Sequence, residues 1–157
     1  FGVGTTVVGI VMVTAYETEL VTTMAPGDTA TLSGYELTLD GAEVVSGPNY
    51  TAERVTFALS GGGGGVRTVT SERRVFVASG MPTTEAAIVT DGFSQLYVSV
   101  GEVSSEGRVV RVWFKPFVTL IWLGAVLMAM AGVVSLTDRR LRVGVPARRR
   151  QSPAPAE

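Results

Sequence analysis

The run from Phe117 to Leu136 holds 20 residues without a charged side chain, and it limits what this chain can fold into. As an α-helix the run would be roughly 30 Å long, which is the thickness of the hydrocarbon core of a bilayer. A helix buried in a soluble protein usually keeps a polar face, whereas this run has only two hydroxyl-bearing side chains. We therefore expect residues 116–137 to form a transmembrane helix, with Pro116 in its first turn.

The residues on either side of this run fit a membrane span. Trp113 and Trp122 lie near its start, where aromatic side chains are common at membrane interfaces, and Arg139 and Arg140 follow its end. We expect these four residues to anchor the chain at the two interfaces. Charged residues make up only 17% of the chain, compared with about 25% in ordinary soluble domains.

The first 16 residues are also uncharged, although they are few for a complete span. They lack the basic start and the small-residue cleavage site of a signal peptide. We interpret residues 1–16 as a truncated transmembrane helix and the chain as a fragment of a larger membrane protein. Small residues are expected to allow close helix packing: Gly2, Gly4 and Gly9 on the first helix, and Ala125, Ala129 and Gly132 on the second.

The distribution of charge predicts the orientation. Six Arg and two acidic residues follow Leu136, whereas residues 17–115 contain 7 basic and 12 acidic residues. Because basic flanks stay in the cytoplasm, we expect residues 138–157 to be a cytoplasmic basic tail. Its richness in Pro, Ala and Arg is typical of disorder. Residues 17–115 are then outside, which in a bacterium is the periplasmic side of the inner membrane.

Residues 17–115 have the period-two pattern of β-strands. Tyr35, Leu37 and Leu39, for example, alternate with polar residues, and Gly- and Pro-containing turns separate such runs. The pattern predicts a mainly β domain, either an antiparallel β sandwich or a small barrel, flanked by the two helices.

Several local features are predicted within this domain. Asp40-Gly41 has the composition of a turn, and residues 61–65 and 104–107 have that of hairpin loops. The five glycines of residues 61–65 are not a phosphate-binding loop, because no Gly-Lys-Ser/Thr follows them. Residues 83–87 are expected to form one helical turn, the only non-strand piece marked in the domain.

Composition also excludes several classes of function. The chain has no Cys and no His, which removes disulfides, thiolate nucleophiles, Ser–His–Asp triads and His-ligated metal or haem. A net charge of −1 argues against a nucleic-acid-binding protein that relies on overall basicity. No arrangement of residues suggests catalysis, so no catalytic, cofactor-binding or metal-binding residue is predicted.

Arg73, Arg74 and Glu85 form the candidate docking site. Adjacent residues on a strand point to opposite faces, so one of the two arginines is expected to be partly buried and to need a carboxylate. Glu85 is the candidate for that carboxylate. Either this pair is a salt bridge that fixes a loop to the sheet, or these residues face a partner protein.

Several short motifs follow one another along the chain. They are Met24-Ala25-Pro26-Gly27, Leu32-Ser33-Gly34-Tyr35, Gly47-Pro48-Asn49-Tyr50, Met81-Pro82-Thr83-Thr84-Glu85-Ala86-Ala87-Ile88, Leu96-Tyr97-Val98, Lys115-Pro116-Phe117, Ile121-Trp122-Leu123-Gly124 and Asp138-Arg139-Arg140. In order and spacing, residues 1–142 resemble the C-terminal end of the CcmF family, the large membrane haem lyase subunit of bacterial cytochrome c maturation.

The resemblance implies a part in haem delivery to apocytochrome c and in its covalent attachment. The implied partners are a CcmE-type haem chaperone, a CcmH-type subunit, apocytochrome c and membrane lipid, without nucleic acid. Haem would be a cofactor of the longer protein and not of this segment, because the family's haem-handling residues match no position here. The segment would act as a periplasmic scaffold and docking domain with a membrane anchor. The alternative from the residues alone is an independent membrane-anchored β binding module unrelated to haem.

Overall fold

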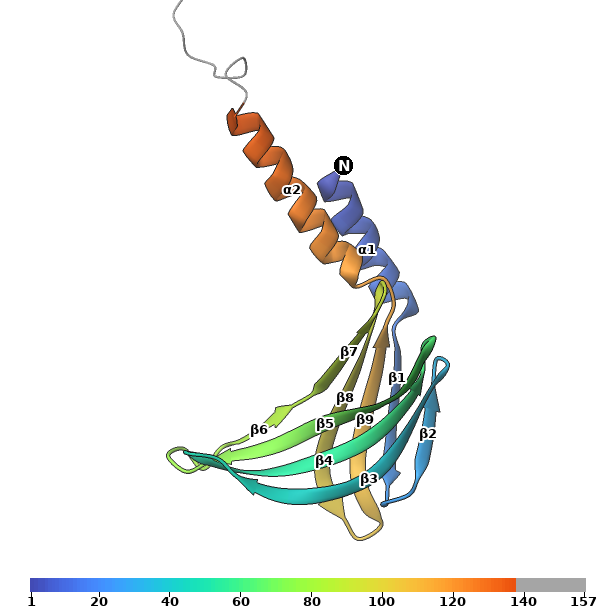
Figure 1. Cartoon of the computed structure of the whole chain (residues 1–157), viewed down its shortest axis with the longest axis vertical. Helices are drawn as coiled ribbons and strands as arrows, with labels where there is room; N and C mark the ends of the chain where they lie inside the picture. The colour runs from blue at the N-terminus through green and yellow to red at the C-terminus, as the bar shows by residue number, and fades with distance from the viewer. Residues whose placement is uncertain (138–157) are drawn as a thin grey trace, which may run out of the picture.

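The chain folds into two antiparallel β-sheets packed face to face, with two helices at one end (Figure 1). The structure is a computed structural model, and it describes residues 1–137. One sheet has the strand order β1-β9-β8-β7 and the other β2-β3-β4-β5-β6. The strands are β1 Thr18–Met24, β2 Thr29–Leu32, β3 Tyr35–Ser46, β4 Tyr50–Gly61, β5 Gly64–Phe76, β6 Pro82–Glu85, β7 Ala87–Asp91, β8 Ser94–Ser104 and β9 Gly107–Lys115. The predicted β sandwich is thus confirmed, and the barrel alternative is wrong.

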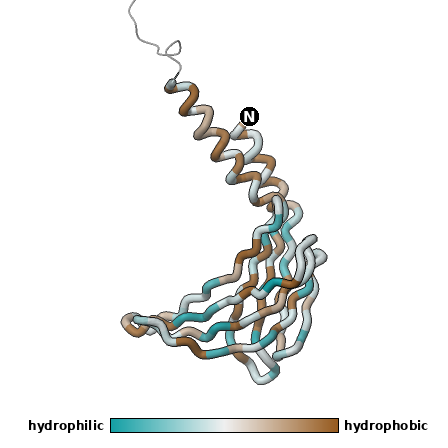
Figure 2. Tube along the Cα trace, viewed as in Figure 1, coloured by the Kyte–Doolittle hydropathy of each residue, from teal (hydrophilic) through white to brown (hydrophobic). Residues whose placement is uncertain are grey.

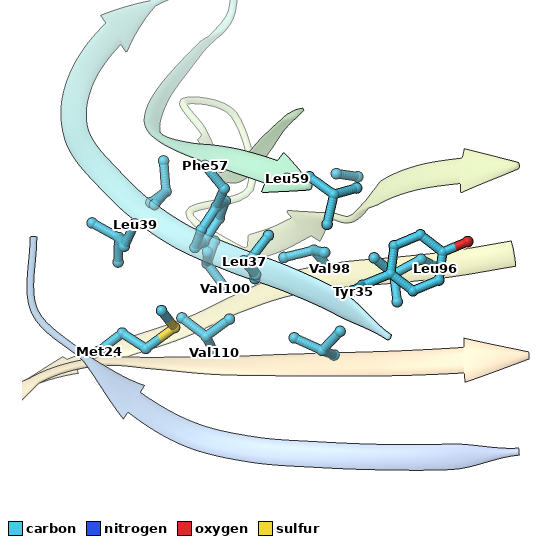
Figure 3. Packing of buried hydrophobic residues seen from close by; sticks show 13 residues of the cluster. Met24, Tyr35, Leu37, Leu39, Phe57, Leu59, Leu96, Val98, Val100 and Val110 are labelled. Atoms are coloured by element: carbon cyan, nitrogen blue, oxygen red, sulfur yellow. The ribbon is translucent and has the colours of Figure 1, made fainter. Parts of the chain in front are cut away.

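The core lies between the two sheets and is built from alternate residues of each strand. Val55, Phe57 and Leu59 of β4 are fully buried, and Phe57 and Leu59 face buried residues of β8 and β9 in the opposite sheet (Figure 3). Burying each such side chain stabilises the fold by roughly 1.5–3 kcal/mol relative to leaving it exposed. The period-two pattern of the sequence therefore results from one buried face on each sheet.

Tyr35 closes the core at the end nearest the helices. Its ring packs 5.8 Å from that of Phe114, and its hydroxyl donates a hydrogen bond to Asp91 Oδ2 at 3.2 Å. Burial raises the pKa of the Tyr35 hydroxyl, and the bond to Asp91 raises that pKa further. The hydroxyl therefore remains a donor that links the two sheets.

The Asp40-Gly41 prediction was wrong, because β3 continues through both residues to Ser46. The pairing of β3 with β4 shifts between Leu39 and Gly41, which is a β-bulge. A bulge leaves one residue unpaired and bends the strand, and Gly inside a strand often marks one. The predicted hairpin loops at residues 61–65 and 104–107 are confirmed as the β4–β5 and β8–β9 turns.

The helical turn predicted at residues 83–87 was also wrong. Strand β6 pairs with β5, with Thr83 opposite Arg74 and Glu85 opposite Glu72, and β7 then begins at Ala87 in the other sheet. Ser71 Oγ also donates to the Glu85 carbonyl at 2.7 Å. The segment is extended because the edge of the five-stranded sheet satisfies its backbone groups, and threonine favours a strand.

Helix α1 spans Gly2–Tyr16 and α2 spans Thr119–Thr137. Helix α2 begins three residues later than predicted, because Pro116 lies in a turn before it. By length and composition α2 is the one described helix that could cross a membrane, with a mean hydropathy of 2.1, and α1 is apolar but shorter. Figure 2 shows both helices as mainly hydrophobic.

The two helices pack against each other through glycine. A Cβ on Gly124 would lie 2.7 Å from both the Gly2 carbonyl oxygen and the Thr6 amide nitrogen, and a Cβ on Gly9 would lie 2.9 Å from the Ile121 amide nitrogen. The close packing predicted for Gly2 and Gly9 is therefore present. Gly4 and Gly132 have no described atom within 4 Å of such a Cβ, so α1 uses Gly124 and does not approach Gly132.

The helices continue directly into neighbouring strands. Glu17 alone separates α1 from β1, and β9 runs through a short turn into α2. Strands β1 and β9 pair with each other from Thr18–Phe114 onward, and Lys115 Nζ lies 3.5 Å from Glu17 Oε2. The sandwich is thus attached to the helix pair at two adjacent strands, without a flexible linker.

Candidate docking surface

Strand β5 places Arg73 and Arg74 on opposite faces of its sheet, as alternation requires. Arg74 lies on the outer face together with Glu72, and Arg73 lies on the inner face, where it reaches toward the other sheet. Arg73 Nη2 lies 3.5 Å from Glu102 Oε1 on β8. The predicted docking residues are therefore divided between two surfaces.

The outer face carries a row of alternating charges, which we call the charged ladder: Glu43, Arg54, Glu72, Arg74 and Glu85, from β3 to β6. Arg54 Nη1 lies 3.4 Å from Glu43, and Arg54 Nε donates to Glu72 Oε1 at 2.7 Å. Arg74 Nε donates to Glu72 Oε2 at 2.8 Å, and Arg74 Nη1 donates to Glu85 Oε1. The predicted partnership of Arg74 with Glu85 is thus present in the structure, at one end of a longer network.

Glu72 is the centre of the charged ladder. It is only 8% exposed although it lies on an outer face, because the two arginines cover it. The hydrogen bonds from Arg54 and then Arg74 lower the pKa of its carboxyl below the ordinary value. The same bonds to Glu72 raise the pKa values of both arginines. All three side chains are therefore charged across the physiological range.

An aromatic pair extends the ladder at its Arg74 end. The Arg74 guanidinium lies 4.6 Å from the centroid of the Tyr50 ring, and Tyr50 packs edge-on against Phe76 at 5.8 Å. Stacking on an aromatic face holds a guanidinium in place. Arg74 is thus fixed on three sides by Tyr50, Glu72 and Glu85, and its charge is largely satisfied within the domain.

Glu85 is the part of the ladder that is most available to another molecule near Arg74. Its side chain is 49% exposed, and every residue of β6 is exposed at the edge of the five-stranded sheet. A short edge strand has unpaired backbone groups on its outer side. The surface can therefore offer a carboxylate together with backbone donors and acceptors.

Sequence reasoning assigned no role to Glu72, Arg54 or Tyr50. The position of Glu72 two residues before Arg74 was a usable signal, because residues i and i+2 of a strand share a face. Arg54 and Tyr50 lie on β4, and only the strand register brings them opposite Glu72 and Phe76. No pattern within one strand reveals that register.

The predicted interface anchors occupy different elements. Trp113 is half-buried on the outer face of β9, where it pairs across with Tyr97, and Trp122 is exposed in the first turn of α2. Arg139 and Arg140 lie outside the described residues. The role of all four as anchors stays a prediction.

Within the described residues, no group of three or more Asp or Glu side chains is arranged to hold a metal ion. The chemistry available at the ladder is recognition through charge, hydrogen bonds and an edge strand. That chemistry is suited to binding a protein partner.

Residues 15–116 match the family described as the CcmF C-terminal beta-sandwich. Among curated proteins, the chain is 51% identical over 152 residues to the cytochrome c-type biogenesis protein CycK of Rhizobium meliloti, covering 96% of this chain and 22% of the relative. It is 38% identical over 152 residues to CcmF of Pseudomonas aeruginosa, covering 96% of this chain and 23% of the relative. It is 33% identical over 142 residues to CcmF of Escherichia coli, covering 90% of this chain and 22% of the relative.

A solved structure has the same fold. The chain superimposes on cytochrome c heme lyase CcmF with a TM-score of 0.73 at 16% sequence identity, covering 88% of this chain and 23% of that one. The chain thus spans less than a quarter of the length of these three relatives and of the solved structure.

Proposed function

Because the chain belongs to the CcmF family of cytochrome c-type biogenesis proteins, we propose that it is the docking and anchoring domain of a membrane haem lyase subunit. In this proposal the longer protein takes part in haem delivery to apocytochrome c and in its covalent attachment. The names of the relatives and of the solved structure support this assignment.

The continuous connection between strands and helices is the observation that carries the proposed role. Strands β1 and β9 pair side by side and lead into α1 and α2, and the Glu17–Lys115 ion pair lies at the junction. A domain held at two adjacent points has little freedom to rotate or to move away from the membrane. Contacts between its surface and other membrane-held subunits then occur at a raised effective concentration.

The proposed membrane placement is supported by α2 and by the charges beyond it. Helix α2 has the length and hydropathy of a span, and six Arg follow Leu136 in the sequence. By the positive-inside rule this end is cytoplasmic, so the sandwich projects into the periplasm of the inner membrane. Helix α1 lies beside α2 as a second membrane helix, with Trp113 and Trp122 near the periplasmic interface and Arg139 and Arg140 at the other.

The proposed docking surface is the Glu85 end of the charged ladder. Arg74 holds Glu85 in place and contributes a charge that is largely neutralised by Glu72. Glu85 then presents an exposed carboxylate beside a short edge strand. This arrangement suits a partner with a basic segment, and a CcmH-type subunit, a CcmE-type haem chaperone or apocytochrome c is the candidate.

Haem itself is proposed to be handled elsewhere in the longer protein. The sequence has no His and no Cys, which are among the common protein ligands of haem iron. The domain's contribution would be to place a partner and not to ligate haem.

Charge reversal in the full-length protein tests this proposal. Glu85→Arg and Arg74→Glu should each lower the yield of holo-cytochrome c while the protein accumulates at its normal level in the membrane. Glu43→Arg is the matched control, because Glu43 lies at the opposite end of the same ladder and is also exposed. An unchanged yield in both test variants would reject docking at this surface, whereas an equal loss in the control would indicate a general effect of the ladder on folding.

A further inference from the structure

The β7–β8 turn lies against the start of α2, at the end of the sandwich where the helices are (Figure 1). The Thr119 amide donates to the Phe93 carbonyl at 3.3 Å, and Thr119 Oγ1 donates to the Gly92 carbonyl at 3.4 Å. These bonds place the turn level with the first turn of the apolar helix.

Gly9 of α1 lies level with the first turn of α2, because it packs against Leu120 and Ile121. The segment from Ile10 to Tyr16 therefore lies on the sandwich side of that level, and it accounts for about 10 Å of helix. This segment is uncharged, and several of its side chains are exposed in the described structure. An apolar medium that covers this end of α1 would therefore extend past the level of the β7–β8 turn.

The turn carries an apolar side chain where hairpins usually carry polar ones. It has two central residues, Gly92 and Phe93, and Gly92 adopts a φ of 57° that a residue other than glycine rarely takes. Phe93 is 55% exposed. The other two-residue hairpin turns of the described chain have small or polar central residues, and turn positions favour such residues.

A second aromatic residue lies next to this turn. Phe117, in the turn between β9 and α2, is 41% exposed and has a φ of 59°. A bulky side chain in this backbone region is unusual, and such strain often occurs where a function requires it. Here the conformation places a second exposed ring two residues from Thr119. Trp122 adds a third in the first turn of α2.

We propose that the β7–β8 turn is a separate membrane contact, with Phe93 inserted at the boundary between lipid headgroups and acyl chains. Aromatic side chains are favoured at this depth, and the exposed apolar end of α1, on the sandwich side of the turn, indicates an apolar surrounding. With α1 and α2 the turn forms a three-point support that fixes the tilt of the sandwich. The inference rests on the proposed membrane placement of α2 and adds an element that is not a helix.

The absence of native cysteine makes a depth measurement direct. The 157-residue chain would be reconstituted in phosphatidylethanolamine–phosphatidylglycerol vesicles with one nitroxide label at a time, on Phe93→Cys, Val126→Cys in α2 or Glu106→Cys in the β8–β9 turn. For each label, the accessibility to oxygen is divided by the accessibility to a water-soluble nickel complex. The ratio at position 93 should be shifted toward the ratio at position 126. The label at position 106 should be accessible to the nickel complex.

The outcomes separate this inference from the proposed anchoring. If positions 93 and 106 are equally accessible to the nickel complex while 126 is in lipid, the turn does not insert and the anchor stands. If position 93 is shielded from both reagents, protein covers it and the inference is again overturned. If position 126 is itself aqueous, both proposals fail.

A variant that keeps an aromatic ring at the turn guards against disturbance by the label. Phe93→Trp, in a chain with Trp113→Phe and Trp122→Phe, should lose fluorescence with lipids brominated on their acyl chains. Val103→Trp, at an exposed position far from the helices, is the matched control and should not. Equal fluorescence of Phe93→Trp with and without bromine would contradict insertion.

Discussion

Glu72 Oε1 accepts a hydrogen bond of 2.7 Å from Arg54 Nε, and its other oxygen accepts one of 2.8 Å from Arg74 Nε. One nearly buried carboxylate therefore joins β4 and β5 on an outer face of the sandwich, and its two arginine partners extend the network to β3 and β6. Glu85 at the edge is held by an arginine whose position depends on Glu72. The hydrogen bonds of the Glu72 carboxylate and the geometry of the proposed docking surface are thus linked.

Acid should weaken the domain through Glu72. Because the folded-state pKa of Glu72 is lowered, its contribution is complete above the unfolded-state value of about 4.3. The contribution is lost as the pH falls through the folded-state pKa. Urea unfolding at a series of pH values should therefore show that Glu72→Gln is less stable than the natural chain at neutral pH, by about 1–2 kcal/mol.

The difference between the two chains should shrink as the pH falls from about 6 to about 3. Comparing the two chains removes the effect of the other carboxyl groups, which titrate in both. A difference that stays constant over this range would mean that Glu72 is not held as a carboxylate in the folded state.

The Arg108–Glu53 pair crosses the sandwich and should be costly to break. Arg108 is 7% exposed and donates to Glu53 on the opposite sheet, and its other terminal nitrogen has no partner among the described residues. Glu53→Ala should lower the free energy of unfolding by about 2–4 kcal/mol, because it leaves a buried charge unpaired.

Arg108→Met together with Glu53→Ala should restore part of that stability, because a methionine fills the space without a charge. Urea unfolding of the single and double variants measures the difference. A double variant no more stable than Glu53→Ala would show that the arginine is not the source of the penalty.

The contact between α1 and α2 should depend on Gly124 and not on Gly132. Gly124→Ile places atoms where the Gly2 carbonyl and the Thr6 amide lie. A Cβ at position 132, in contrast, has no described atom within 4 Å. In vesicles, nitroxide labels on Val8→Cys and Leu123→Cys should move apart in the Gly124→Ile variant and keep their distance in Gly132→Ile. Equal distances in both variants would contradict glycine-mediated packing.

Much of the fold could be predicted from local patterns because each strand buries one face. Tyr35, Leu37 and Leu39, which alternate with polar residues in the sequence, are all buried on one face of β3. The wrong predictions concern segments whose conformation depends on pairing with a neighbouring strand. Asp40-Gly41 has turn composition, but its pairing with β4 forms a bulge. Residues 83–85 are extended because they pair with the edge of β5, and Ala87 pairs with β8 in the other sheet.

The candidate site was predicted only in part for the same reason. Alternation along β5 separates Arg73 from Arg74, and a nearby carboxylate was expected at Glu85. The other partner of Arg74, Glu72, is in the same strand, but its burial depends on Arg54 of β4. Such a network depends on cross-strand register, which no single segment of sequence encodes.

In the proposed topology, α2 spans the membrane, and the sandwich and the C-terminal arginines are on opposite sides of it. Because the chain has no cysteine, single Glu85→Cys and Arg142→Cys variants can be treated with a membrane-impermeant maleimide in intact bacteria with a permeabilised outer membrane. We expect position 85 to be labelled in intact cells and position 142 to be labelled only after the inner membrane is disrupted. Labelling of position 142 and protection of position 85 in intact cells would contradict this topology.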